Sequence, residues 1–231
     1  MSEQKTLGWG ITNEEGAEIW DDSPLFNSMS MKEKLMLVFY PKKFVLYRAI
    51  KKYKKEWGKT NKGKIFRVLD VGCGTGSSVI DLKRYLGDTT IVAGIDVVSL
   101  QIEIAKRKAS DCGVDVEFLT YDGIHIPYES EFFDVVYSSD VLGHVENVPA
   151  WLDEIKRVLK FEGLLAMFSE SKLGKHAYIR KYLFARGLNT DPHKEYHISL
   201  YSKDELKKMF FDRNFFIERM YSTVWAKMMV H

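Results

Sequence analysis

The sequence has little cysteine and no long apolar run. Among its 231 residues are two cysteines, Cys73 and Cys112, so no disulfide framework is predicted and a reducing compartment is the default. No stretch of about eighteen apolar residues occurs, so no membrane span is predicted. The first residues, MSEQKTLGWG, lack the basic start and apolar core of a secretory signal. We therefore expect a cytoplasmic protein.

Net charge is also low. The 34 Lys and Arg residues nearly cancel the 32 Asp and Glu residues, which leaves a formal net charge of +2. A strong overall field for nucleic acid or membrane is therefore not implied, and nucleic acid is not an expected partner. The apolar fraction of 45% is typical of a globular protein with a sizeable core. The length suits one compact domain with an N-terminal elaboration.

The residue pattern of the chain changes near residue 62, because the segment before it lacks the alternation that is typical of strands. We predict an N-terminal helical cap over residues 1–62 and an α/β domain over residues 63–231. After Pro41, an apolar stripe at three- and four-residue steps predicts a helix, and its members are Phe44, Tyr47, Ile50, Tyr53 and Trp57. The basic residues within 42–55 are interpreted as the solvated face of this helix. Peripheral contact of that face with an anionic membrane stays open as the less favoured alternative.

Downstream of residue 62, apolar strands alternate with helical segments. The predicted strands are 66–71, 90–96, 114–120, 132–139 and 164–169. The predicted helices are 77–86, 99–112 with Ser99 as N-cap, 148–160 with Pro149 in its first turn, and 202–213. This alternation predicts a doubly wound, mostly parallel sheet with helices on both faces. Two last apolar runs, 215–220 and 223–230, can form an antiparallel hairpin at the edge of the sheet.

The densest motif joins the first strand to the first helix of the sheet. The run Val68-Leu69-Asp70-Val71-Gly72-Cys73-Gly74-Thr75-Gly76 carries glycine at three alternate positions. Glycine permits a tight turn and lets a ligand lie against bare backbone, and open α/β sheets bind ligands at this end of their strands. The G-x-G-x-G spacing differs from the G-x-G-x-x-G of dinucleotide sites. A carboxylate at Asp70 opposes a pyrophosphate and suits the ammonium group of S-adenosylmethionine (SAM).

Acidic residues end the next two strands as well. Asp96 follows Gly76 by twenty residues, where a carboxylate can accept both hydroxyls of a ribose. Asp122, within Tyr121-Asp122-Gly123, can accept a hydrogen bond from the exocyclic amine of adenine, although a simple turn residue is the alternative. Cys73 is interpreted as small filler in the loop, because no basic neighbour in sequence activates its thiol.

The chain resembles the class I SAM-dependent methyltransferases on the combination of these motifs. The matching runs are VLDVGCGTGSS, GIDVVSLQIEIAKRKA, YDGIHIPYESEFFDVVYSSDVLGHV and WLDEIKRVLKFEGLLAMF, which together cover about residues 65–170. The resemblance is to the ubiquinone/menaquinone-biosynthesis subgroup. It implies a Rossmann-like sheet of seven strands whose last strand is antiparallel, with an N-terminal helical lid and an acceptor-lid insertion at about 170–200. One departure is Lys160-Phe161-Glu162-Gly163, where the family often has Lys-Pro-Gly-Gly.

The resemblance also implies roles for individual residues. It assigns Asp70, Gly72, Gly74 and Gly76 to the methionine side of SAM, with Cys73 inside the same loop. It assigns Asp96 to the ribose, Val97 to the adenine face, Asp122 and Gly123 to the adenine edge, and Ser138 and Ser139 to the region of the methyl group. The N-terminal segment is implied to shape the acceptor pocket, with candidate lid residues Trp9, Trp20, Phe26, Met29 and Met31. For any single one of them, plain packing against the sheet is the favoured alternative.

Two histidines are the candidate catalytic residues, because a base is needed when the acceptor loses a proton. His144 follows the fourth strand, and a buried structural histidine is its alternative interpretation. His197 ends the cluster His193-Lys194-Glu195-Tyr196-His197 and begins a segment similar to the acceptor lid of small-molecule methyltransferases. No metal site is predicted there, because a second ligand set and nearby cysteines are lacking.

The resulting hypothesis is an enzyme that transfers the methyl group of SAM to a small-molecule acceptor, apolar or amphiphilic, at an O, N or C atom. Three alternatives stay open: an RNA or protein methyltransferase, a catalytically silent SAM-binding partner subunit, and a nicotinamide-dependent oxidoreductase. The segment Ser138-Ser139-Asp140-Val141 disfavours the methyltransferases that use Asn-Pro-Pro-Tyr at this strand. The G-x-G-x-G spacing disfavours the oxidoreductase.

Overall fold

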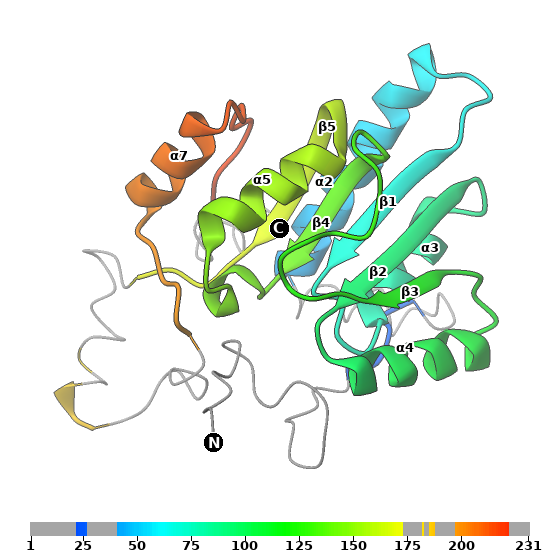
Figure 1. The fold of residues 1–231 in the computed structure, drawn as a ribbon. Coiled ribbons are helices and arrows are strands. Elements are labelled where there is room, and N and C mark those ends of the chain that lie inside the picture. Colours follow the sequence, from blue (N-terminus) through cyan, green and yellow to red (C-terminus); the bar gives the residue numbers. More distant parts are fainter. Residues whose placement is uncertain (1–21, 27–40, 173–181, 183–184, 188–196, 222–231) are drawn as a thin grey trace.

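The computed structural model describes residues 22–26, 41–172, 182, 185–187 and 197–221. Within these residues a parallel sheet of five strands has the order β3-β2-β1-β4-β5 (Figure 1). Its strands are β1 (Phe66–Val71), β2 (Thr90–Asp96), β3 (Glu117–Thr120), β4 (Phe133–Ser139) and β5 (Leu159–Phe168). The order runs outward from β1 to β3 and then restarts at β4, so the point between β1 and β4 is the topological switch point of the sheet.

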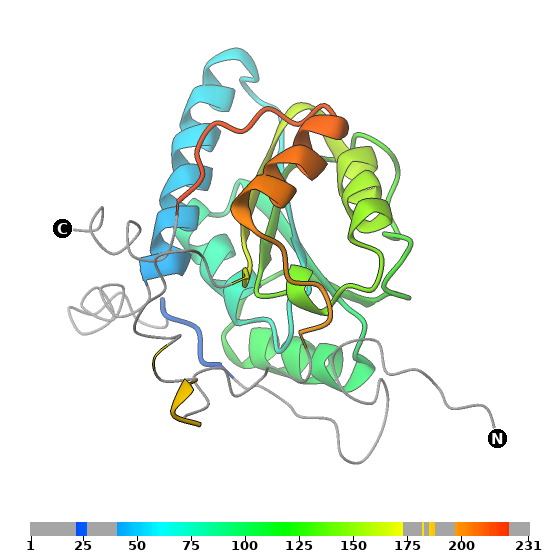
Figure 2. The ribbon, with the colours of Figure 1, turned by 90° about the vertical axis from the view of Figure 1, so that its left-hand side faces the viewer.

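Helices cover both faces of the sheet (Figure 2). One face carries α2 (Pro41–Thr60), α3 (Ser77–Leu86) and α4 (Ser99–Asp111), and the other carries α5 (Val148–Val158) and α7 (Lys203–Asp212). The side chains of β1 alternate between these layers: Phe66 and Val68 pack toward α2 and α3, whereas Leu69 and Val71 pack toward α5. The predicted doubly wound α/β architecture is therefore confirmed.

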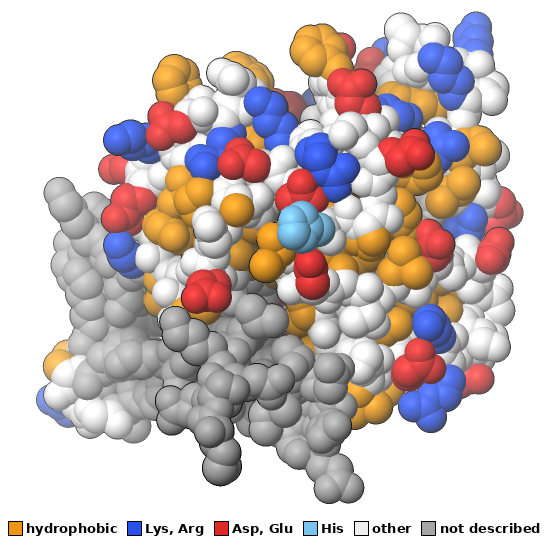
Figure 3. All heavy atoms as spheres, viewed as in Figure 1, with side chains coloured by type: hydrophobic (Ala, Val, Ile, Leu, Met, Phe, Trp, Pro, Cys, Tyr) orange, Lys and Arg blue, Asp and Glu red, His pale blue; other side chains and the backbone are white. Residues whose placement is uncertain are grey.

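Helix α2 follows the apolar stripe predicted after Pro41. Tyr47 and Ile50 are fully buried, and Trp57 meets Phe66 of β1 edge-on with ring centroids 5.0 Å apart. The solvated basic face is only partly formed, because Lys43 is buried and Lys54 donates hydrogen bonds to Leu86 O and Thr90 Oγ1. On the face shown in Figure 3, Lys and Arg side chains are interspersed with Asp and Glu, as the low net charge predicts.

Several predicted boundaries need correction. Helix α4 begins at Ser99, but its N-cap is Val98, so Ser99 is the first helical residue and not the cap. Strand β3 starts at Glu117, three residues later than predicted, and β5 starts at Leu159, before Gly163. The strand boundaries differ because pairing depends on the neighbouring strand: β3 pairs with β2 only from Glu117, and Leu159 of β5 already pairs with Phe133 of β4.

The predicted strand over 215–220 is not formed. Phe215 packs edge-on against Phe210 of α7, whereas Phe216 is 91% exposed, so this run covers the sheet's helical layer and pairs with no strand. Its expected hairpin partner, 223–230, lies outside the described residues.

No helix in the described ranges is long and apolar enough to cross a bilayer.

Candidate functional site

A cavity of about 1140 Å³ opens at the carboxyl ends of the strands, across the switch point between β1 and β4. Its walls come from the β1–α3 loop, the ends of β2, β4 and β5, the short helix η1 (Leu142–His144), the first turn of α5 and residues near His197. Parallel sheets bind ligands at such a crevice. The cavity is larger than a single drug-sized ligand usually needs.

The glycine loop forms one wall, and its glycines serve different purposes. Gly72, Gly74 and Gly76 all have positive φ, between 54° and 81°. A Cβ on Gly72 would lie 2.2 Å from Val141 Cγ2, so only glycine lets the loop approach the segment after β4. A Cβ on Gly76 would lie 2.7 Å from Phe118 Cζ, within the core. Gly72, Cys73 and Gly74 line the cavity, but Gly76 does not: it allows α3 to pack closely on its neighbours.

Asp96 holds this loop in place from the end of β2. It is 7% exposed, and its Oδ2 accepts a hydrogen bond of 2.8 Å from Gly74 N while its Oδ1 accepts one of 2.9 Å from Val98 N. Burial raises the pKa of this carboxyl, and the backbone N–H groups oppose that rise. Each carboxylate oxygen can accept a further hydrogen bond, so Asp96 remains able to bind a ribose hydroxyl.

Asp70 and Lys43 both line the wall of the cavity, and the charge of Lys43 acts on the Asp70 carboxyl. Asp70 is buried, and burial raises its pKa to about 8, with Lys43 lowering and Asp96 raising it. Lys43 Nζ lies 3.2 Å from Asp22 Oδ2, and Asp22 lines the cavity as well. Sequence reasoning missed Lys43 and Asp22, because Lys43 stands in a run of lysines in which nothing distinguishes the buried member.

Besides Gly76, two further predicted cofactor residues lie outside the cavity lining, Asp122 and Ser138. The Asp122 carboxylate accepts hydrogen bonds from Ile124 N and His125 N and contacts His125 Nδ1, and these groups lower its pKa to about 2, the His125 N–H most strongly. Asp122 therefore shapes the loop, while its neighbours Tyr121 and Gly123 line the cavity. Ser138 is buried and donates to Val71 O at 2.9 Å, joining β4 to β1.

The residues after Asp96 and Ser138 face the cavity. Val97 and Ser139 both contribute to its lining, as the predicted placement beside the ligand requires. Side chains alternate along a strand, so only one of two consecutive serines can face the cavity. Here Ser139 faces it, and Ser138 points into the protein. Sequence alone named both serines without choosing between them.

The two candidate histidines meet at the other end of the cavity. The rings of His144 and His197 lie 4.9 Å apart between centroids, tilted by 39°, and both line the cavity. Gly143 makes this approach possible, because a Cβ there would lie 3.1 Å from His197 Cδ2 and 3.2 Å from Glu170 Oε2. Ser199 N donates to Gly143 O and fixes the segment after His197 to η1. Glu170, which sequence reasoning missed, lines the cavity beside Gly143 as well.

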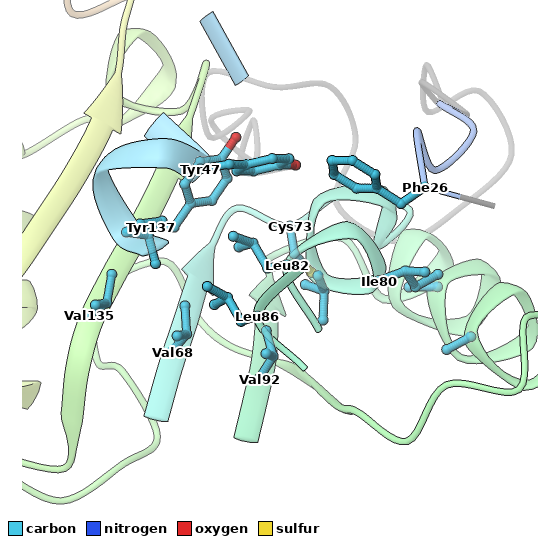
Figure 4. Close-up of a cluster of buried hydrophobic side chains, with 14 of the residues drawn as sticks. Phe26, Tyr47, Val68, Cys73, Ile80, Leu82, Leu86, Val92, Val135 and Tyr137 are labelled. Atoms are coloured by element: carbon cyan, nitrogen blue, oxygen red, sulfur yellow. The ribbon is translucent and has the colours of Figure 1, made fainter. Parts of the chain in front are cut away.

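Phe26 is not part of a lid over the cavity. It is 4% exposed and packs in the core, where its ring is tilted against Tyr47 at 6.3 Å between centroids (Figure 4). It also stacks on Tyr85, with ring centroids 5.4 Å apart. Its carbonyl and N–H bond to Arg84 and Asp81 of α3, which ties residues 22–26 to the protein core. The other candidate lid residues lie outside the described residues: Trp9, Trp20, Met29 and Met31. So do His193 and Glu195; in the described ranges no group of three potential metal ligands occurs.

A parallel sheet with a glycine loop at its switch point, a buried carboxylate at the end of the next strand and a cavity above them defines a nucleoside-binding α/β domain. Comparison with known proteins identifies which kind. Residues 69–167 match the family described as "Methyltransferase domain". The fold resembles the crystal structure of a SAM-dependent methyltransferase from Aquifex aeolicus, with a TM-score of 0.55 and 23% identity, covering 72% of this chain and 81% of that one.

Curated relatives agree with this family. The chain is 33% identical over 106 residues to a demethylmenaquinone methyltransferase from Staphylococcus saprophyticus, covering 46% of this chain and 45% of the relative. It is 29% identical over 170 residues to one from Staphylococcus aureus, covering 68% and 70%. The match thus spans about half the length of the first relative. The methyltransferase family thus matches residues 69–167, and both of these relatives are demethylmenaquinone methyltransferases.

Proposed function

We propose that the protein transfers the methyl group of SAM to a small-molecule acceptor. The observation that carries this proposal is the glycine loop held by Asp96 at one end of a cavity that extends to two histidines at the other. Such a cavity offers room for a nucleoside cofactor and an acceptor side by side. Methyl transfer is an in-line displacement, so holding the two ligands in line supplies much of the rate.

The residues along the loop fit SAM from one end to the other. Asp70 suits the ammonium group, and the bare backbone of Gly72, Cys73 and Gly74 leaves room for the methionine chain. Asp96 takes the ribose, and Val97 and Gly123 flank the adenine. In this proposal Gly76, Asp122 and Ser138 act indirectly: Gly76 through close packing, Asp122 by shaping the adenine loop, and Ser138 by orienting Ser139 beside the methyl group.

On the acceptor side, SAM supplies an activated methyl group, and the protein supplies position and a base. The acceptor atom forms its bond to the methyl carbon while the carbon–sulfur bond breaks and its electron pair goes to sulfur. A proton lost by the acceptor is taken by the pair of His144 and His197, with Glu170 beside them. Val141, Phe168 and Leu200 provide apolar walls at this end, which favours an apolar or amphiphilic acceptor such as a quinone precursor.

The outer parts of the chain complete this proposal. Residues 223–230 add an antiparallel strand to the five described strands, and residues 170–200 form an acceptor-lid insertion in a domain over 63–231. Residues 1–62 provide an N-terminal helical cap. Its support is that Asp22 and Lys43 line the cavity, although α2 itself packs on the sheet core.

The test has two stages. Calorimetric titration with SAM, its demethylated product and NAD should show saturable binding of the first two only. The same two ligands should raise the Tm in a thermal-unfolding experiment. Incubation with labelled SAM and a panel of hydroxylated arenes, demethylated quinols and short lipids, followed by mass spectrometry, should reveal a methylated product. Failure of SAM to bind at millimolar concentration contradicts the proposal. Binding without turnover across the panel favours a catalytically silent subunit.

A further inference from the structure

The loop over residues 121–132 connects β3 to β4 on the face of the sheet that carries α5 (Figure 1). It forms neither helix nor strand, yet Tyr121, Gly123 and Ile124 line the cavity. A Cβ on Gly123 would lie 3.2 Å from Val97 Cγ1, so the loop lies close against Val97. A small displacement of this loop therefore changes the space that we assign to the adenine.

An ion pair on α5 holds the middle of this loop. The Arg157 guanidinium donates hydrogen bonds of 2.8 Å to Ile126 O and 2.8 Å to Tyr128 O. It also binds both carboxylate oxygens of Glu154, at 2.7 and 2.8 Å. Glu154 Oε2 in turn accepts a hydrogen bond of 3.0 Å from Ile126 N. The N–H and the C=O of Ile126 are thus both bonded to the same ion pair.

The geometry of this ion pair suits it to fix a loop. Glu154 and Arg157 stand three residues apart, so they share one face of the helix. The guanidinium is planar, so a carboxylate that binds one edge fixes the direction of the remaining N–H groups. Their mutual hydrogen bonds lower the pKa of Glu154 and raise that of Arg157, which keeps both charged at neutral pH.

Helix α5 gives the ion pair a rigid base. Trp151, Leu152 and Ile155 are buried on its inner face, so the helix is packed into the protein core. The loop is thereby tied to the core through side chains of α5, although it has no regular structure of its own.

We propose that Glu154 and Arg157 are positioning residues for the adenine end of the cofactor. They act through residues 121–128, and neither is among the described residues that line the cavity. Because the ion pair keeps Gly123 against Val97 before SAM arrives, binding does not have to order the loop. This inference rests on the proposed function, since it concerns the same cofactor. The residue pattern placed both side chains within a predicted helix and gave neither a role.

The test replaces Arg157 with methionine, which removes its four hydrogen bonds. Hydrogen exchange of the ligand-free full chain should become faster over residues 121–128 and stay unchanged over 66–76. A loop that is correctly placed in about one molecule in ten reduces the apparent affinity about tenfold. Calorimetric titration should therefore show about tenfold weaker binding of SAM. Binding of 5′-methylthioadenosine, which has the adenosyl group but no amino acid, should weaken by the same factor.

Lys156→Met is the matched control, because it introduces the same side chain at the adjacent residue of α5. Lys156 Nζ also donates to a backbone carbonyl, that of Arg213, at 2.6 Å. That bond ties α5 to the end of α7 and not to the loop. The control should leave the exchange of residues 121–128 and both affinities at the wild-type values.

Arg157→Lys keeps the test decisive if Arg157→Met does not fold. Lysine retains a charge beside Glu154 but lacks the planar fork, so its exchange rate and its affinities should lie between those of the wild type and Arg157→Met. Recovery of neither readout relative to Arg157→Met contradicts the positioning role.

Several results overturn the inference. Unchanged exchange over residues 121–128 in both Arg157 variants does so, as does wild-type affinity despite faster exchange. Faster exchange in all segments at once also does so, because it indicates global destabilisation. A loss for SAM that 5′-methylthioadenosine does not share places the effect at the methionine end and contradicts the inference as well. Absence of SAM binding to the wild type defeats the proposed function itself, whereas the other outcomes leave that function standing.

Discussion

The two ends of the cavity are built in different ways. The proposed cofactor end comes from residues 70–123, on consecutive strand ends, and backbone hydrogen bonds to Asp96 and Ile95 hold its loop. The proposed acceptor end is assembled from η1, the residues after β5 and the segment from His197, which lie far apart in the chain. One end is a local motif on a rigid sheet, and the other depends on packing between segments. A methyltransferase can therefore keep its cofactor chemistry while its acceptor end varies.

The sharpest contrast between the two ends should appear on replacing the histidines. We expect His144→Asn and His197→Asn each to lower the rate of product formation by about 100- to 1000-fold, the usual scale for a lost general base, with SAM affinity unchanged. If the pair acts as a unit, the double variant should be no slower than the slower single variant. Mass spectrometric rates with an acceptor from the panel provide the measurement.

His125 is the matched control for this experiment, because its side chain is 76% exposed and lies outside the cavity lining. His125→Asn should retain the wild-type rate. A His144 or His197 variant with near-normal turnover would show that the acceptor end needs no base from these residues.

At the cofactor end, Asp96→Ala should weaken SAM binding by about 100-fold, because it removes the ribose acceptor and the charge-assisted hydrogen bonds to Gly74 N and Val98 N. Calorimetric titration measures the loss. The same change should leave the His144–His197 contact intact, since that contact belongs to other segments. Near-normal affinity in this variant would mean that the ribose lies elsewhere.

Asp70 provides a pH-dependent test of the same end. Its folded-state pKa of about 8 exceeds the unfolded value, so the ligand-free fold retains a proton that the unfolded chain releases. Stability from this group is present at low pH and is lost as the pH rises through the folded pKa. The ligand-free Tm should therefore fall between about pH 5 and about pH 8, and fall less in Asp70→Asn. Lys43 and Asp96 are the charged groups that act on Asp70. An equal fall in both proteins would show that Asp70 ionises normally.

The smallest effect is expected at Asp122. Its side chain is 55% exposed and its carboxylate is engaged by its own loop, so Asp122→Ala should weaken SAM binding by only about twofold. Titration beside Asp96→Ala compares a buried carboxylate with an exposed one at neighbouring strand ends. A loss at Asp122 as large as that at Asp96 would return Asp122 to direct contact with adenine.

Local patterns were sufficient for much of the fold. Strands 66–71 and 90–96 and the helix 77–86 were predicted to the residue, because apolar runs and glycines mark their ends. The prediction of a strand at 215–220 was wrong. An apolar run can be buried either by pairing at a sheet edge or by packing on a helix, and its sequence does not distinguish the two. Glu170 and Lys43 carried no signal, since their roles depend on neighbours distant in sequence.

By itself, the sequence determined the α/β class, the glycine loop, the acidic strand ends and the two histidines, because spacing along the chain encodes backbone geometry near each motif. Only the tertiary structure decided which members of those sets face the cavity: Ser139 and not Ser138, Gly123 and not Asp122, Lys43 among many lysines. It also brought His144 to His197. The physical reason is that burial and hydrogen-bond partnership are properties of three-dimensional neighbours, and those neighbours come from segments that spacing does not connect.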